Sequence, residues 1–208
     1  MPLVATSHSP TKIHLMCAAL AVMLIMGLSL TAQDFPLVVE GRGGIALPVA
    51  SFSNGPDRGG EIGRAPTFGL HFVYRGPSGW GPYIGFSQHR FDCAADGCPA
   101  GTGTSAQEYV ATNWDIGSQR TIGNFGWVRA GFLFGRLERD FASAEGLLHR
   151  TSSLSVGVEG GLGLNVPIKG RVRLTPGIRY SWLNTRFRDD GLVRLRWLAA
   201  DVGLVLGL

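Results

Sequence analysis

Ionisable residues recur at alternate positions along several stretches of this chain, among glycine and other small residues. In an extended segment alternate side chains point to the same face, so these charges would share one face of a sheet. The set comprises Glu40, Arg42, His71, Asp115, Arg129, Glu159, Arg173, Arg179 and Asp201. If that face is enclosed, the charges must pair with one another, because desolvating an unpaired charge costs several kcal/mol.

A second set of arginines falls on the opposite parity, next to long Gly/Ser/Pro-rich segments. It comprises Arg64, Arg90, Arg136, Arg194 and Arg196. A guanidinium group binds phosphate through two parallel hydrogen bonds, so this set could hold phosphate groups. The alternative is that these are ordinary solvated arginines whose aliphatic stems lie along apolar surface.

Other reactive residues give weaker patterns. Cys93 and Cys98 lie in one Gly/Ala/Thr-rich segment, and in an oxidising compartment we expect them to form a disulfide. A nucleophile activated by histidine could be built from His149 with Ser152 or Ser153 and Glu145, or from His89 with Ser87. We expect neither set to be catalytic, and we expect no metal site and no cofactor.

The residues that could do chemistry sit on segments with strict two-residue alternation. In Ser153–Val166, apolar Leu154, Val156, Val158, Leu162 and Leu164 alternate with small or polar residues. Eight such segments are predicted, the first seven at Leu37–Leu47, Pro66–Arg75, Trp80–Asp92, Glu108–Arg120, Phe125–Arg139, Ser153–Val166 and Arg171–Leu183. The eighth follows a loop at Asn184–Gly191 and runs to Leu208.

The connections between these segments alternate long and short, with tight turns at Gly76–Gly79, Thr121–Asn124 and Pro167–Gly170. This rhythm favours an eight-stranded antiparallel up-and-down barrel. A soluble barrel such as a lipocalin would place its apolar parity inside. Here the other parity carries the charges, and aromatic residues of the apolar parity stand near strand ends, at Tyr74, Trp80, Phe125 and Trp182. Both features favour a transmembrane β-barrel with its apolar side chains facing lipid.

Composition agrees with a sheet protein, since 31 of the 208 residues are Gly and only 16% are charged. The net charge of +4 comes without a Lys/Arg run, so nucleic acid is not an expected partner. Lys12, the apolar stretch from about Leu15 to Leu30, and Thr31-Ala32-Gln33 predict an export signal over residues 1–33, with a membrane anchor helix as the alternative. The barrel domain is then residues 34–208.

The segments and the opening VEGRGGIALP at Val39–Pro48 resemble the OmpA-like and OmpX-like family of small outer-membrane barrels. The resemblance covers roughly Phe35–Leu208. It implies a bacterial outer membrane, termini on the periplasmic side and insertion by the barrel-assembly machinery. These proteins commonly end on an aromatic residue, whereas this chain ends Gly207-Leu208.

We therefore expect a barrel with a structural or surface-interaction role, four long external loops and an unknown external ligand. An eight-stranded lumen is filled by side chains, so the inward charges predict an ionic plug, with a gated pore as the alternative. A narrow channel for small or hydrophobic solutes is the second function considered. A lipid A-modifying enzyme is the third, but Thr151 stands where the deacylase His-x-Ser motif needs serine. In this setting the arginine set would contact membrane lipid and lipopolysaccharide phosphates.

Overall fold

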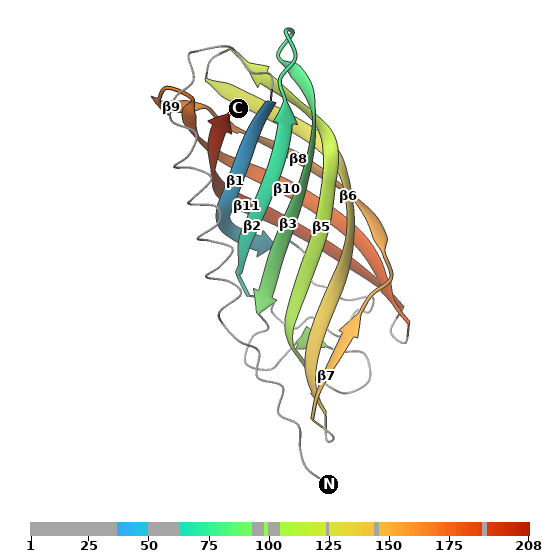
Figure 1. Cartoon of the computed structure of the whole chain (residues 1–208). Coiled ribbons are helices and arrows are strands. Elements are labelled where there is room, and N and C mark those ends of the chain that lie inside the picture. Colours follow the sequence, from blue (N-terminus) through green and yellow to red (C-terminus); the bar gives the residue numbers. More distant parts are fainter. Residues whose placement is uncertain are drawn as a thin grey trace. The chain divides into compact units, whose positions relative to one another are not determined.

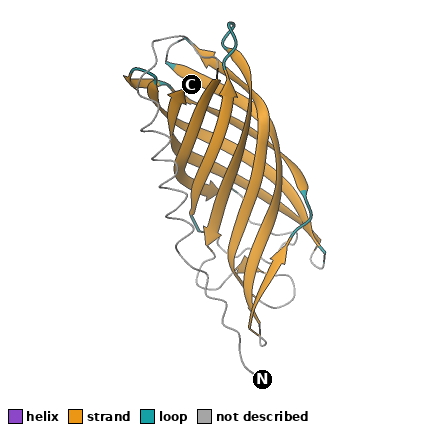
Figure 2. Ribbon diagram, viewed as in Figure 1, coloured by secondary structure: helices purple, strands orange, loops and turns teal. Residues whose placement is uncertain are grey.

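The computed structural model describes residues 37–49, 63–92, 98–99, 105–123, 125–143, 146–188 and 191–208. The predicted export signal lies outside these ranges, as does Cys93 of the predicted disulfide. All regular structure in the described ranges is strand (Figure 2). Across those ranges, no helix combines the length and apolarity needed to cross a membrane.

The strands belong to one antiparallel sheet. Their bounds are β1 Leu37–Pro48, β2 Ala65–Tyr74, β3 Trp80–Asp92, β4 Cys98–Pro99, β5 Ser105–Ile122, β6 Gly126–Ser143, β7 Gly146–Thr151, β8 Ser155–Leu164, β9 Val166–Lys169, β10 Val172–Phe187 and β11 Gly191–Gly207. β4, β7 and β9 are short additions that pair with β5, β6 and β10 respectively.

The other eight strands form a closed barrel, which confirms the predicted fold class (Figure 1). Each pairs with its neighbour along the chain, and the ring closes where β1 pairs with β11. That closing ladder runs from Val38 opposite Gly207 to Pro48 opposite Trp197. Because both edges are paired, the barrel leaves no open sheet edge around its circumference.

The third predicted turn, Pro167–Gly170, is wrong in part, because Val166–Lys169 forms β9 and the chain reverses at Gly170–Arg171. The three tight turns of the barrel lie at one end, which we call the short-turn end. Each contains one glycine with positive φ: Gly79 at 78°, Gly123 at 54° and Gly170 at 56°. Side chains of other residues rarely adopt this left-handed backbone conformation, so glycine there allows the sharp reversal. The opposite end, which carries the longer connections, is called the long-loop end.

Several strands extend further toward the long-loop end than predicted. β5 and β6 are each 18 residues long. Between the predicted strands Phe125–Arg139 and Ser153–Val166, β6 continues to Ser143 and returns as β7 in a hairpin. The predicted loop Asn184–Gly191 is also wrong in part, because β10 continues to Phe187, which pairs with Gly191 at the start of β11. Continued pairing gives the backbone N–H and C=O groups partners that a loop would not supply.

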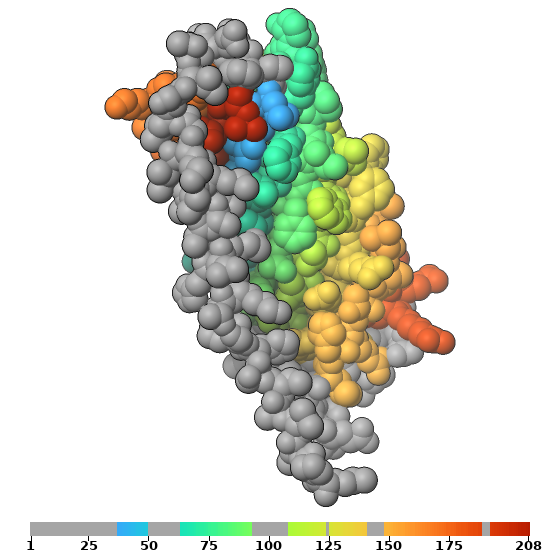
Figure 3. Space-filling model, in the orientation of Figure 1, coloured from blue at the N-terminus to red at the C-terminus, as the bar shows by residue number. Residues whose placement is uncertain are grey.

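Side chains alternate between the interior and the exterior along most of the length of the eight barrel strands. The outward parity exposes large apolar residues, among them Ile84, Trp114, Phe132 and Leu162. In the space-filling view, the side chains of β2, β3, β5 and β6 form a continuous outer surface of the barrel (Figure 3). The predicted assignment of the apolar parity to the outside is therefore confirmed.

Inward-facing glycines make room for the largest interior side chains. The indole of Trp127, which is 1% exposed, lies against Gly161, Gly163 and Gly177. A Cβ atom added at Gly163 or Gly177 would approach the indole to 2.7 or 2.5 Å. The glycine-rich parity of β8 thus provides a slot for a tryptophan on β6.

Candidate functional site: a layered interior and an arginine rim

The predicted inward charges converge in the middle of the barrel, with one exception. Eight of the nine are at most 4% exposed: Glu40, Arg42, His71, Asp115, Arg129, Glu159, Arg179 and Asp201. Arg173 shares their parity but stands at the second residue of β10, at the barrel mouth, and is half-buried. No ion pair within the described ranges includes Arg173, so it stands apart from the cluster. Alternation along a strand predicts whether a side chain points inward or outward, but not how far along the barrel axis it lies.

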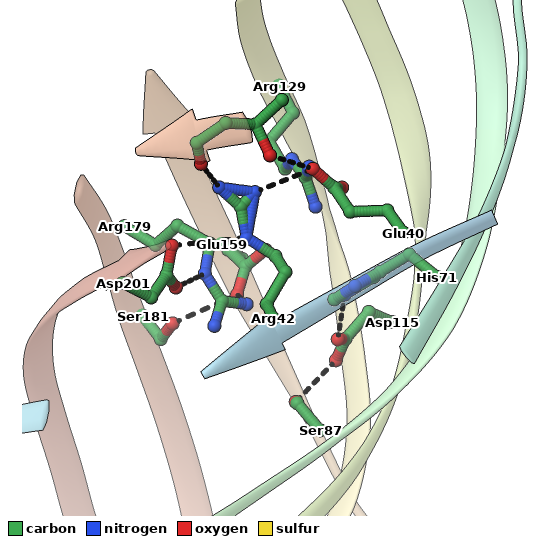
Figure 4. Close-up of polar contacts among 11 residues, drawn as sticks. Glu40, Arg42, His71, Ser87, Asp115, Arg129, Glu159, Arg179, Ser181 and Asp201 are labelled. Carbon is green, nitrogen blue, oxygen red and sulfur yellow. Dashed lines mark hydrogen bonds and ion pairs between the residues drawn. The ribbon is translucent and has the colours of Figure 1, made fainter. Parts of the chain in front are cut away.

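Six of these residues form a chain of ion pairs across five strands (Figure 4). Arg179 on β10 joins Glu159 (Nη1–Oε2, 3.2 Å) and Asp201 (Nε–Oδ2, 2.7 Å). Arg42 joins Asp201 (Nε–Oδ1, 3.1 Å) and Glu40 (Nη1–Oε1, 3.0 Å), and Arg129 pairs with the other oxygen of Glu40. Three cations and three carboxylates alternate, so the chain is neutral.

Hydroxyl and backbone groups complete this chain. The Thr175 hydroxyl donates to Glu40 Oε1 at 2.7 Å, and Arg42 Nη2 donates to the Thr175 carbonyl at 2.9 Å. Ser181 donates to Glu159 Oε2 at 3.3 Å. Sequence reasoning missed both residues, although both have the inward parity. Their roles depend on which strands are neighbours, which alternation within one strand does not reveal.

A second polar group lies beside the ion-pair chain. His71 Nε2 is 3.0 Å from Asp115 Oδ2, and Ser87 donates to Asp115 Oδ1 at 3.1 Å (Figure 4). Ser87 and His71 therefore both contact the carboxylate instead of each other. This arrangement orients Asp115, but it does not activate the serine hydroxyl as a nucleophile.

Arginines of the ion-pair chain also stack on aromatic rings. The guanidinium carbons of Arg42 and Arg129 lie 4.6 and 4.5 Å from the centroid of Trp127. Arg129 lies 5.1 Å from the Tyr83 ring as well. Cation–π contacts stabilise a desolvated guanidinium, so Trp127 supports two of the three cations.

Apolar layers cover the polar middle on both sides, so the interior is not polar along its whole length as predicted. Near the long-loop end a buried cluster comprises Ala46, Ala65, Phe91, Tyr109, Ala111, Leu133, Leu137, Leu183, Phe187, Leu195, Trp197 and Ala199. Near the short-turn end a smaller cluster comprises Val38, Val73, Tyr83 and Val205. The inward parity therefore changes from apolar to ionic to apolar along the barrel.

His89 lies within the long-loop apolar layer. It is 1% exposed, and its ring centroid is 4.9 Å from that of Trp197 and 6.3 Å from that of Phe91. Ser87, considered as its catalytic partner, is fully buried and bonds to Asp115. The pair is thus enclosed by other side chains.

His149 has different partners from those considered in the sequence. Its Nδ1 atom is 2.6 Å from Asp140 Oδ1 on the neighbouring strand, and its Nε2 atom is 3.5 Å from the Thr151 hydroxyl. Ser152 accepts a hydrogen bond from the Leu137 N–H at 2.9 Å, and Ser153 donates to the Arg186 carbonyl. Both serines therefore hydrogen-bond to the backbone of neighbouring strands. Glu145 lies outside the described residues.

The arginines of the second set lie on the outward face near the long-loop end. Arg64, Arg90, Arg136 and Arg194 are exposed, and Arg196 is half-buried. Arg90 Nη1 lies 3.9 Å from Glu108 Oε1. Arg196 instead stacks on Trp182, with its Cζ atom 4.9 Å from the ring centroid. Sequence reasoning missed Arg186, which is exposed on the same face because β10 runs four residues beyond its predicted end.

Comparison with known proteins identifies the fold. No family model matches the chain, and neither does any curated protein. Among solved structures, Neisserial surface protein A has a TM-score of 0.50 at 11% identity, covering 86% of this chain and all of that one. The outer membrane protein OprG from Pseudomonas aeruginosa has a TM-score of 0.53 at 14% identity, covering 84% and 98%. The chain has the fold of small outer-membrane barrels, as the resemblance predicted.

Proposed function

We propose that this chain is a bacterial outer-membrane barrel with a structural or surface-interaction role and a lumen closed by its own side chains. The observation that carries the proposal is the layered interior, in which a neutral chain of ion pairs lies between two apolar clusters. A continuous water path would have to cross both apolar layers. Surface interactions would then depend on the connections between strands at the long-loop end.

The outward face supports the membrane location. Large apolar side chains cover the middle of the barrel wall, and aromatic residues stand at its ends, as lipid-facing surfaces require. At the short-turn end Tyr74, Trp80 and Phe125 are all exposed. Export, insertion by the barrel-assembly machinery and contact with lipopolysaccharide belong to the same proposal.

We expect no catalysis from this barrel. Asp140, His149 and Thr151 lie in the order that a nucleophilic triad would need, but the contact between histidine and hydroxyl is 3.5 Å. His149 and Asp140 are also largely solvated, and an exposed pair of this kind contributes under about 1 kcal/mol. Release of fatty acid from lipid A by the purified protein, abolished in Thr151→Ala, would contradict this expectation.

Conductance in planar bilayers tests the closed lumen. The full chain, extracted in detergent and shown by heat-modifiable gel migration to be folded, is expected to give no steady channels. A larger outer-membrane porin in the same bilayers serves as the positive control. Regular conductance steps that persist in repeated preparations would contradict a side-chain plug.

A narrow channel for hydrophobic solutes is the second candidate. The observation in its favour is the long-loop apolar layer, where Phe91, Tyr109 and Trp197 face the lumen. Uptake of a small apolar dye into vesicles that contain the barrel would support it. With the lumen closed, we expect uptake equal to that of protein-free vesicles.

A further inference from the structure

Five outward-facing residues form a compact group on the last hairpin, which we call the β10–β11 patch. Trp182, Asn184 and Arg186 stand at successive outward positions of β10, and Arg194 and Arg196 at successive outward positions of β11. The register places Trp182 opposite Arg196 and Asn184 opposite Arg194. Directly opposed residues of an antiparallel pair have neighbouring side chains, so the three guanidinium groups share one small area.

One arginine of the patch is held in place by its neighbours. Trp182 Nε1 donates a hydrogen bond to Asn184 Oδ1 at 2.8 Å, which fixes the indole. The guanidinium of Arg196 lies over that ring at 4.9 Å. Stacking on a fixed aromatic face restricts the arginine fork before a ligand arrives, which reduces the entropy lost on binding.

The patch differs in charge from the rest of the rim. On β3, β5 and β6 the outward arginines Arg90 and Arg136 share the face with four carboxylates, Asp92, Glu108, Glu138 and Asp140. Among the described residues, by contrast, no carboxylate lies within ion-pair distance of Arg186, Arg194 or Arg196. Asp189 and Asp190 follow Arg188 in the connection between β10 and β11 and lie outside the described residues. Within the described strands, the outward face of β10–β11 presents arginines without carboxylates, which favours an anion on this face.

The patch stands at the border of the apolar wall. The next outward pair toward the short-turn end is Tyr180 opposite Leu198. Both side chains are exposed, and each presents a largely apolar surface. Tryptophan and arginine at such a border place their polar groups at headgroup height while their apolar parts contact acyl chains.

We propose that the β10–β11 patch binds the phosphoryl groups of a phosphorylated glycolipid of the lipid A type in the surrounding leaflet. Arg196, stacked on Trp182, makes a bidentate contact to one phosphoryl group. Arg194 and Arg186 neutralise the remaining charge of the phosphoryl groups. The site rests on the proposed membrane location and narrows the lipid contact to one hairpin. Arg64, Arg90 and Arg136 are left outside it.

Binding of labelled bisphosphoryl lipid A to the detergent-folded full chain tests the site. The triple variant R186Q/R194Q/R196Q is expected to bind at least about tenfold more weakly than wild type, since loss of a single charge-assisted hydrogen bond already lowers affinity about tenfold or more. The matched triple R64Q/R90Q/R136Q removes the same charge from the same rim and is expected to stay within about twofold of wild type. Trp182→Ala should weaken binding about threefold, and Trp114→Ala, an exposed tryptophan on β5, should not.

Three results would overturn the site. The first is an equal loss of lipid A affinity in the two triple variants, and the second is equal affinity of the wild-type protein for dephosphorylated lipid A. The third is displacement of lipid A by inorganic phosphate at constant ionic strength, which would indicate a free-phosphate site. Heat-modifiable migration of every variant shows that its barrel is folded. Fractionation of the wild-type chain away from the outer membrane would defeat the proposed location, and the detergent titration would still report separately on the patch.

Discussion

At the scale of single residues, Arg179 shows why the interior depends on complete pairing. Its guanidinium contacts two carboxylates from two other strands, and its side chain is 1% exposed. A buried ion pair adds little net stability relative to apolar packing, but removal of one partner leaves a buried charge without compensation. The network therefore selects one register of the strands more than it adds stability.

Arg179→Met is expected to lower the free energy of unfolding by about 3–5 kcal/mol, because Glu159 and Asp201 would each lose a buried partner. Urea unfolding in lipid vesicles, followed by tryptophan fluorescence and gel migration, measures the change. Arg64→Met, at an exposed rim position, is the control and should change stability by less than about 1 kcal/mol. Equal effects of the two variants would argue against the network.

Gly177→Ala is expected to destabilise the barrel by about 1–3 kcal/mol, because the new Cβ would meet the Trp127 indole at 2.5 Å and the Leu162 carbonyl at 2.8 Å. In a Trp127→Leu background, Gly177→Ala should cost less than in wild type, because only the conflict with the Leu162 carbonyl remains. Gly160→Ala, whose Cβ would have nothing within 4 Å, provides the neutral control in the same unfolding assay.

At the scale of elements, period-two alternation predicts strands well because each strand is an independent pattern. The first two tight turns and the β3 bounds were predicted correctly for this reason, and so was the outward apolar face. Alternation assigns a face but carries no information on height or on neighbouring strands. Three features therefore could not be predicted without the register in which the strands pair. They are the apolar layer around Trp197, the rim position of Arg173 and the partners of His149. The β6–β7 hairpin was missed because its polar residues resemble those of a loop.

Ser152 lies between β7 and β8. Its hydroxyl oxygen accepts the hydrogen bond from the Leu137 N–H that a backbone carbonyl would accept in a regular ladder. Ser152→Ala would leave the buried Leu137 N–H without its acceptor, at a cost of about 1–3 kcal/mol. We expect faster proteolysis of the β6–β7 hairpin in folded protein, with gel migration of the barrel unchanged. Ser153→Ala is the control, because its hydrogen bond to the Arg186 carbonyl is exposed and water can replace it. Equal cleavage of both variants would contradict the role of Ser152.

At the scale of the whole molecule, the charges divide into two populations with different solvent exposure. The interior pairs are desolvated, whereas the rim arginines face solvent. Salt screens exposed charges over about 8–10 Å at ordinary ionic strength but acts weakly on buried pairs. Stability and lipid binding should therefore respond differently to salt.

Raising NaCl from about 0.1 to 1 M is expected to change the free energy of unfolding by less than about 1 kcal/mol while clearly weakening lipid A binding by wild-type protein. Parallel urea titrations and binding titrations measure the two responses, and the R186Q/R194Q/R196Q triple variant serves as the binding control. A steep loss of stability with salt would mean that the interior ion pairs are accessible to solvent ions.

Closure by β1 and β11 has a consequence for biogenesis. Asp201 on β11 supplies a carboxylate to Arg42 on β1 and to Arg179 on β10. A chain halted before β11 would hold two guanidinium groups in an apolar enclosure without that counter-charge, and would also leave two strands with unpaired edges. Forms that lack β11 are thus disfavoured by unpaired charge as well as by unpaired strand edges.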